Sequence, residues 1–397
     1  MANENLGNAK REKNDEFYTQ YADIEKEMNA YLEFNPDVFR NKTVLLPCDD
    51  PEWSNFTKYF AQRFQDLGLK KLISTSYAPN SKPKDIPYQP TLFEMDSPEF
   101  DEEKTYENGK IFTLTRDTTG DDAINVDDLE WSYLKGDGDF RSDEITALRD
   151  EADIIITNPP FSLFREFLAW LAEGEKKFVV LGNMNAITYK EVFPLIKSNK
   201  IWAGTKPFGG GMDMIMPTGA FDSEKAGIYS TNELGQFVKN IMGVIWFSNL
   251  DHGRRHQPLS LMTMEENLKF NKAVKDVGYQ KYDNYDAIEV PRTDAIPSDF
   301  DGVMGVPITF LGKYNPDQFE ILGISKAWDL SSGLRVKTYP KQIQVTSDGK
   351  EAEVTKLNDA PALQISGSPS GTFYKVNGKL YEATYQRLLI RHVEAER

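Results

Sequence analysis

The sequence contains very little cysteine and no long apolar run. Cys48 is the single cysteine among 397 residues, so the chain cannot form an internal disulfide, and this absence fits a reducing compartment. No stretch of about 18 apolar residues is present, so no transmembrane helix is expected. The N-terminal residues also lack the apolar core of a secretory signal. We therefore expect a cytoplasmic protein with no membrane partner.

Two further absences restrict the cofactors. The G-x-G-x-x-G pattern is missing, which argues against a nicotinamide cofactor. The chain has three histidines, of which His252 and His256 are four residues apart. No third ligand accompanies this pair in the sequence, so we expect no metal site.

The net charge of −16 argues at first against a nucleic-acid partner, because phosphate binding requires Lys and Arg. The distribution of the charge weakens that argument. Residues 94–153 hold 20 acidic and 6 basic residues, so the rest of the chain is nearly neutral. We interpret this block as a solvated acidic insertion at about 80–135, with a partner-binding surface as the alternative. Basic clusters elsewhere remain available to line a groove.

Short apolar runs alternate with amphipathic segments in the first half of the chain. Strands are expected at 42–47, 70–77, 153–157 and 176–183, and helices at 21–34, 54–69, 145–152, 162–174 and 189–199. This alternation predicts parallel βαβ units in an α/β, doubly wound sheet. Sheets of this kind bind ligands at the carboxyl ends of their strands.

The pattern changes near residue 205, where TKPFGGGMDM begins a glycine-rich loop. Beyond it, strand-like runs are separated by Asp, Pro and Gly turns, and residues 381–397 have the pattern of a terminal helix. We therefore expect two domains, 1–205 and 206–397, the second a mixed α+β domain.

The segment NPPF follows the apolar run 154–156. Neither Pro159 nor Pro160 has an N–H, so their carbonyls act only as acceptors, and Asn158 adds an amide oxygen. Two converging acceptors suit an NH₂ group, and Phe161 offers a flat face to a planar ring. The residues alone leave two interpretations open: a site for an exocyclic amine, or a tight turn before a helix.

Several motifs, collinear over nearly the whole chain, make a more specific pattern. They are NDEFYTQ (14–20), CDDPEWSNFTKYF (48–60), GDGDFRSDE (136–144), NPPFSLFREFL (158–168), ITYKEVFPLIKSNKIW (187–202), WFSNLDH (246–252), YDNYDAIEV (282–290) and DGVMGVPITFLGKYNP (301–316). In these motifs the sequence resembles the EcoRI-type family of adenine-specific DNA methyltransferases. The resemblance implies a Rossmann-like methyltransferase sheet followed by a target-recognition domain.

The resemblance also implies S-adenosylmethionine as the methyl donor and the N6 amine of adenine in double-stranded DNA as the acceptor. It assigns Asn158, Pro159, Pro160 and Phe161 to catalysis. The residues that it assigns to the donor are Phe17, Tyr18, Thr19, Asp49, Asp50, Pro51, Asn55, Asp139 and Phe140. The loop at 49–53 lacks the usual glycine-rich form, and Thr75-Ser76-Tyr77 lacks the carboxylate expected for the donor's ribose.

The second domain is expected to contact DNA through the basic segment NLDHGRRHQPL. Within it, His252, Arg254, Arg255 and His256 lie together in the sequence, and arginine suits both phosphates and guanine edges. The resemblance implies action as a monomer, with any cognate restriction endonuclease acting separately.

Two other functions stay open at this point. One is methylation of RNA or of another planar amine or amide, because the NPPF chemistry does not select DNA. The other is a DNA-binding protein without catalysis that keeps the same fold. The intact Asn158, Pro159, Pro160 and Phe161 argue against the second.

Overall fold

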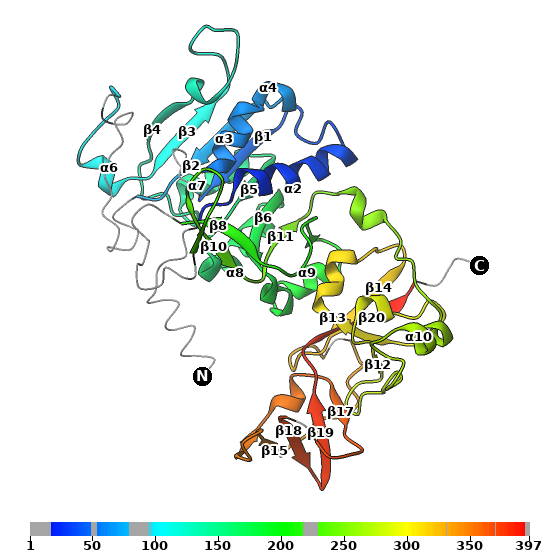
Figure 1. Cartoon of the computed structure of the whole chain (residues 1–397). Helices are drawn as coiled ribbons and strands as arrows, with labels where there is room; N and C mark the ends of the chain where they lie inside the picture. Colours follow the sequence, from blue (N-terminus) through cyan, green and yellow to red (C-terminus); the bar gives the residue numbers. More distant parts are fainter. Residues whose placement is uncertain are drawn as a thin grey trace. The chain divides into compact units, whose positions relative to one another are not determined.

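The computed structural model describes residues 17–48, 54–78, 95, 97–216, 229–330, 332–369 and 371–393. The chain forms two compact units, the first made of Met1–Met184 and Ile201–Gly253, the second of Asn185–Lys200 and Arg254–Arg397 (Figure 1). The change of sequence pattern predicted a boundary at 205. The structure differs because residues 201–253 add strands to the sheets of the first unit.

An eight-stranded mixed sheet forms the centre of the first unit, in the order β4-β3-β2-β1-β5-β6-β11-β7. The strands are β1 (Thr43–Pro47), β2 (Lys71–Thr75), β3 (Lys110–Leu114), β4 (Glu130–Tyr133), β5 (Ile154–Thr157), β6 (Lys177–Asn183), β7 (Trp202–Ala203) and β11 (Val244–Ser248). The four central strands, β2, β1, β5 and β6, run parallel, as predicted. Strand β11 is antiparallel to both of its neighbours. This mixed α/β arrangement is consistent with a methyltransferase fold.

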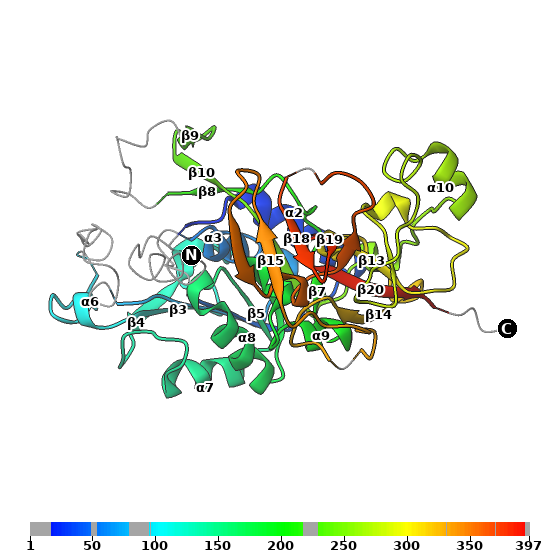
Figure 2. The ribbon, with the colours of Figure 1, turned by 90° about the horizontal axis from the view of Figure 1, so that it is seen from below.

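Helices cover both faces of this sheet (Figure 2). On one face lie α2 (Tyr21–Phe34), α3 (Asn55–Gln62) and α4 (Phe64–Leu67), and on the other α7 (Asp143–Glu151) and α8 (Phe164–Glu173). The Ser54 side chain caps α3 by accepting from the Phe56 amide. Gly68 ends α4 in a left-handed conformation, as its lack of a Cβ allows.

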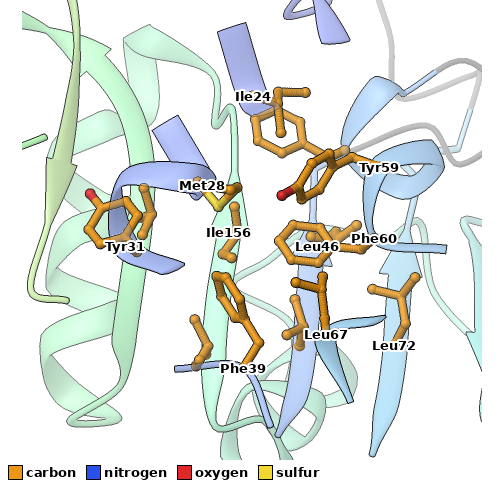
Figure 3. Packing of buried hydrophobic residues seen from close by; sticks show 14 of the residues in the cluster. Ile24, Met28, Tyr31, Phe39, Leu46, Tyr59, Phe60, Leu67, Leu72 and Ile156 are labelled. Atoms are coloured by element: carbon orange, nitrogen blue, oxygen red, sulfur yellow. The ribbon is translucent and has the colours of Figure 1, made fainter. Parts of the chain in front are cut away.

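A large apolar core fixes the α2 and α3 layer to the strands. Met28 of α2 and Phe60 of α3 lie beside Leu46 of β1, Leu72 of β2 and Ile156 of β5 (Figure 3). These side chains are fully buried. Removing this much apolar surface from water holds the carboxyl ends of the parallel strands in fixed positions.

The acidic block is part of the sheet over much of its described length. Strand β3 pairs with β2 and β4 pairs with β3, both antiparallel. The short helix α6 (Lys104–Glu107) precedes this hairpin. The block therefore extends one edge of the sheet, and most of its acidic side chains are exposed, as expected of a solvated block.

A second, smaller sheet belongs to the same unit. It consists of β8 (Met212–Ile215), β10 (Phe237–Ile241) and β9 (Tyr229–Thr231), in the order β8-β10-β9. The N-terminal segment joins its edge, because the backbone of Tyr18 exchanges two hydrogen bonds with that of Ile215.

The second unit consists mainly of strands. One sheet contains β12 (Ile288–Glu289), β13 (Met304–Pro307), β20 (Arg387–His392) and β14 (Phe319–Ile324); the other contains β16 (Glu351–Val354), β15 (Gln342–Val345), β18 (Phe373–Val376), β19 (Lys379–Ala383) and β17 (Ala362–Gln364). Its helices are the short α9 (Phe193–Lys197) and α10 (Met264–Phe270). Among the described helices of the whole chain, none is long and apolar enough to cross a membrane.

The prediction of a terminal helix at 381–397 is wrong for the residues that the structure describes. They form the end of β19 and then β20. Strand β20 lies between β13 and β14, and residues 387–390 are buried. Arg387 forms a buried ion pair with Glu289 at 2.7 Å. Pairing on both sides and burial override the local helical pattern of this segment.

Candidate active site

Asn158 lies directly after β5, at the carboxyl edge of the sheet. Its Nδ2 atom donates a hydrogen bond to the carbonyl oxygen of Phe17 at 2.8 Å. Its Oδ1 atom is buried and has no hydrogen-bond partner among the described residues. A buried acceptor without a partner costs about 1–3 kcal/mol. The arrangement therefore holds one unused acceptor in a fixed orientation.

The two prolines present their carbonyl groups differently. The Pro160 carbonyl accepts from the Leu163 amide at 2.9 Å, at the start of a 3₁₀ turn. No described residue donates to the Pro159 carbonyl. The second acceptor that the sequence predicted is thus available at Pro159 and occupied at Pro160. Phe161 is half-buried and packs partly against the main core.

The segment Phe17–Thr19 lies against this strand end. Its Tyr18 is paired with β8, and the Asn55 side chain donates to the Thr19 carbonyl at 2.8 Å. The Thr19 side chain is buried, and its Oγ1 has no partner among the described residues. The structure therefore brings together Phe17, Thr19, Asn55 and Asn158, which come from three segments that are distant in the sequence.

The loop after β1 is described only at its beginning. Cys48 has a φ of 103°, a conformation that residues with a side chain rarely adopt. Asp49, Asp50 and Pro51 lie outside the described residues. A glycine-like backbone conformation thus occurs at a position where the sequence has cysteine, directly before the loop assigned to the donor.

Asp139 lies in a loop that packs against the end of β2. Gly138 has a φ of 86°, and a Cβ atom there would lie 2.1 Å from the Ser76 carbonyl oxygen, so only glycine fits. Burial alone would raise the pKa of Asp139, but hydrogen bonds from Arg141 and Tyr77 outweigh burial and lower it. The carboxylate therefore stays ionised at neutral pH.

Phe140 has a different place from the one that the sequence indicated. Its side chain is fully buried, and its ring makes edge-on contacts with Phe167 and Trp170 of α8. A ring without exposed surface packs in the core, so the predicted stacking of Phe140 on the donor is corrected. The reason is that the apolar face of α8 takes this aromatic ring.

Thr75, the last residue of β2, is a further candidate that the sequence did not assign to the site. Its side chain is buried, and its Oγ1 has no partner among the described residues. The signal in the sequence was negative: the carboxylate expected at this strand end is absent. A threonine in a strand is otherwise ordinary, so only its unsatisfied hydroxyl marks it.

The basic segment at 252–256 does not form a single cluster of exposed cations. His252 is buried in the first unit, where its Nε2 lies 3.1 Å from the Ala203 carbonyl oxygen. Arg255 is buried in the second unit and donates to Asn199 at 2.6 Å. These two contacts correct the prediction that both side chains reach DNA. Arg254 is half-buried and His256 is exposed. Within the described ranges, no group of three or more His, Cys, Asp or Glu residues is placed to hold a metal.

Comparison with known proteins identifies the family. The model of the family "Adenine-specific methyltransferase EcoRI" matches residues 5–393. Type II methyltransferase M.EcoRI of Escherichia coli is 42% identical over 331 residues, which cover 82% of this chain and 91% of the relative. Type II methyltransferase M.MpnI of Mycoplasma pneumoniae is 33% identical over 314 residues, 79% of this chain and 83% of the relative.

A third relative, Type II methyltransferase M.MgeORF184P of Mycoplasma genitalium, is 35% identical over 319 residues, 79% of this chain and 84% of the relative. No solved structure matches significantly. The family model spans nearly the whole chain and includes both the NPPF turn and the segment Phe17–Thr19 that lies against it. The chain therefore belongs to the EcoRI family of adenine-specific methyltransferases and is a DNA methyltransferase.

Proposed function

We propose that the protein transfers a methyl group from S-adenosylmethionine to the N6 amine of an adenine that is flipped out of duplex DNA. The observation that carries this proposal is a pair of acceptors at the end of β5, Asn158 Oδ1 and the Pro159 carbonyl, to which no described residue donates. An exocyclic amine has two N–H donors and fits two acceptors. The Phe161 ring beside them suits stacking of the base, which contributes about 1–3 kcal/mol.

The residues around the strand ends fit the donor. S-adenosylmethionine carries hydroxyl, amino and carboxylate groups, and Thr19 and Thr75 both hold buried hydroxyls without partners among the described residues. The ionised Asp139 offers an acceptor for the donor's adenine amine. We assign Thr19, Asn55 and Asp139 to the donor, together with Asp49, Asp50 and Pro51 of the adjoining loop.

When bound, the donor supplies a methyl group activated by its sulfonium. The chain's own contribution is to position the acceptor. Asn158 and Pro159 accept the two hydrogens of the amine and thereby direct the lone pair of its nitrogen. The same acceptors favour the positive charge that develops on nitrogen as it is methylated. No general base is needed before attack, and after methylation the positively charged nitrogen loses one proton to water.

Flipping is required because a base inside the duplex cannot reach a protein pocket. Unstacking costs a few kcal/mol, and stacking on Phe161 offsets part of that cost. The relatives are named type II methyltransferases, and a methyltransferase of this kind can protect DNA from a restriction endonuclease. We propose the same role here, with a monomer as the active form, a separate endonuclease as the partner and the cytoplasm as the compartment.

The test uses donor labelled in its methyl group and unmodified bacterial DNA. After digestion to nucleosides, we expect the label in N6-methyl-2′-deoxyadenosine, and in the Asn158→Ala variant we expect it to be lost. Label in RNA but not in DNA, or label in another base, would overturn the proposal. Sequencing of the methylated positions then identifies the target, and light scattering with DNA tests the monomer.

A further inference from the structure

Lys239 lies on the inner face of the three-stranded sheet. It pairs directly with Met214 across the antiparallel ladder of β10 and β8, so both side chains point to the same face. Met214 is fully buried and belongs to the same apolar core as Ile24 and Met28 of α2. Lysine is an unexpected residue on a face that packs against a core.

The ammonium group of Lys239 lies next to the candidate active site. It stands over the Phe17 ring, 5.9 Å from the ring centre, and the carbonyl of Phe17 accepts the hydrogen bond from Asn158. The Lys239 side chain is half-buried, and its ammonium lies against an aromatic ring rather than in an ion pair with a described carboxylate. Its charge is therefore available to an anionic ligand.

We propose that Lys239 binds a phosphodiester of the DNA strand that carries the target adenine. The inference rests on the proposed function, because a flipped adenosine brings its flanking phosphates to the entrance of the pocket. Lysine is a usual phosphate ligand that acts as a point charge. The donor is the less suitable partner, because its ammonium and sulfonium outweigh its one carboxylate and give it a net positive charge.

The experiment compares Lys239→Gln with the unmodified enzyme in DNA binding at several salt concentrations. Without one phosphate contact, the negative slope of log affinity against log salt should become shallower by about one. Binding should weaken by about tenfold. Lys239→Arg keeps the charge and should preserve the slope. Lys70→Gln is the matched control. Lys70 is exposed and directly precedes the amino end of β2, whereas the candidate site lies at the carboxyl ends of the strands.

Calorimetry with S-adenosylmethionine alone separates the two anions. Unchanged donor affinity in Lys239→Gln supports the proposal, whereas weakened donor affinity with an unchanged salt slope would assign Lys239 to the donor's carboxylate and overturn it. No change in either binding reaction would overturn it as well. Lys239→Met keeps the aliphatic contact with Met214 and replaces the glutamine variant if that one unfolds. Failure of the unmodified enzyme to methylate DNA would count against the proposed function instead.

Discussion

Asn158 donates a hydrogen bond to the carbonyl oxygen of Phe17 at 2.8 Å, across 141 positions of sequence. This bond fixes the orientation of the amide: its Nδ2 faces the segment Phe17–Thr19, and its Oδ1 is left for the target amine. The residue assigned to the target amine and the segment assigned to the donor therefore share one contact. We therefore expect a substitution at Asn158 to change the affinity for the donor.

Replacing Asn158 with aspartate tests this connection. A carboxylate cannot donate to the Phe17 carbonyl, so we expect the donor to bind about tenfold more weakly, which corresponds to one lost hydrogen bond. Calorimetric titration with S-adenosylmethionine measures the change. Asn249→Asp is the control, because the Asn249 amide donates in the same way to the Lys176 carbonyl. Lys176 directly precedes the amino end of β6, away from the carboxyl ends of the strands. Equal donor affinity in Asn158→Asp and the unmodified enzyme would contradict the connection.

Thr19→Val should separate ligand binding from stability. The Thr19 hydroxyl has no partner among the described residues, so its removal should leave the free energy of unfolding unchanged or raise it by about 1 kcal/mol. Donor affinity should fall about tenfold if the hydroxyl bonds the donor. Thr57→Val is the matched control, because the Thr57 hydroxyl is bonded to Ser74 at 2.9 Å. That variant should lose about 1–3 kcal/mol of stability; a similar loss in Thr19→Val would refute the assignment.

Gly138→Ala should disturb the loop that carries Asp139. The added Cβ would meet the Ser76 carbonyl and would also have to adopt a φ of 86°. The conformation alone costs about 1–2 kcal/mol, and the clash adds to it. Gly120→Ala isolates the conformational part, because Gly120 has a φ of 77° with nothing within 4 Å of its Cβ. Chemical unfolding of both variants should show the larger loss for Gly138→Ala, and equal losses would rule out the close approach.

The pH dependence of stability should report on Asp139. In the folded protein the pKa of Asp139 lies below the usual value for an aspartate, so folding favours the ionised form. This contribution is therefore fully present above about pH 4 and is lost as the pH falls through the lower, folded-state value. We would measure the free energy of unfolding from about pH 7 to about pH 3. Below about pH 4 it should fall less steeply in Asp139→Asn than in the unmodified protein. Parallel curves would show that Arg141 and Tyr77 do not hold the carboxylate in solution.

The sequence alone determined the parallel centre of the fold and pointed to the NPPF turn as a candidate site. Apolar runs such as 153–157 and amphipathic runs such as 21–34 have periods set by local geometry, and the structure has strand β5 and helix α2 at these positions. Motif order likewise identified the family, because the motifs are collinear over most of the chain.

Tertiary structure decided the rest, because it depends on contacts between distant residues. Burial, which no local pattern specifies, took Phe140 into the core and gave His252 and Arg255 partners inside the protein. Pairing between neighbours turned 387–392 into a central strand. Long-range contacts of the same kind buried Asn158 Oδ1 and the Thr75 hydroxyl without partners among the described residues, and they turned Lys239 inward. An unsatisfied buried group is a property of its surroundings, and the sequence does not show those surroundings until the chain has folded.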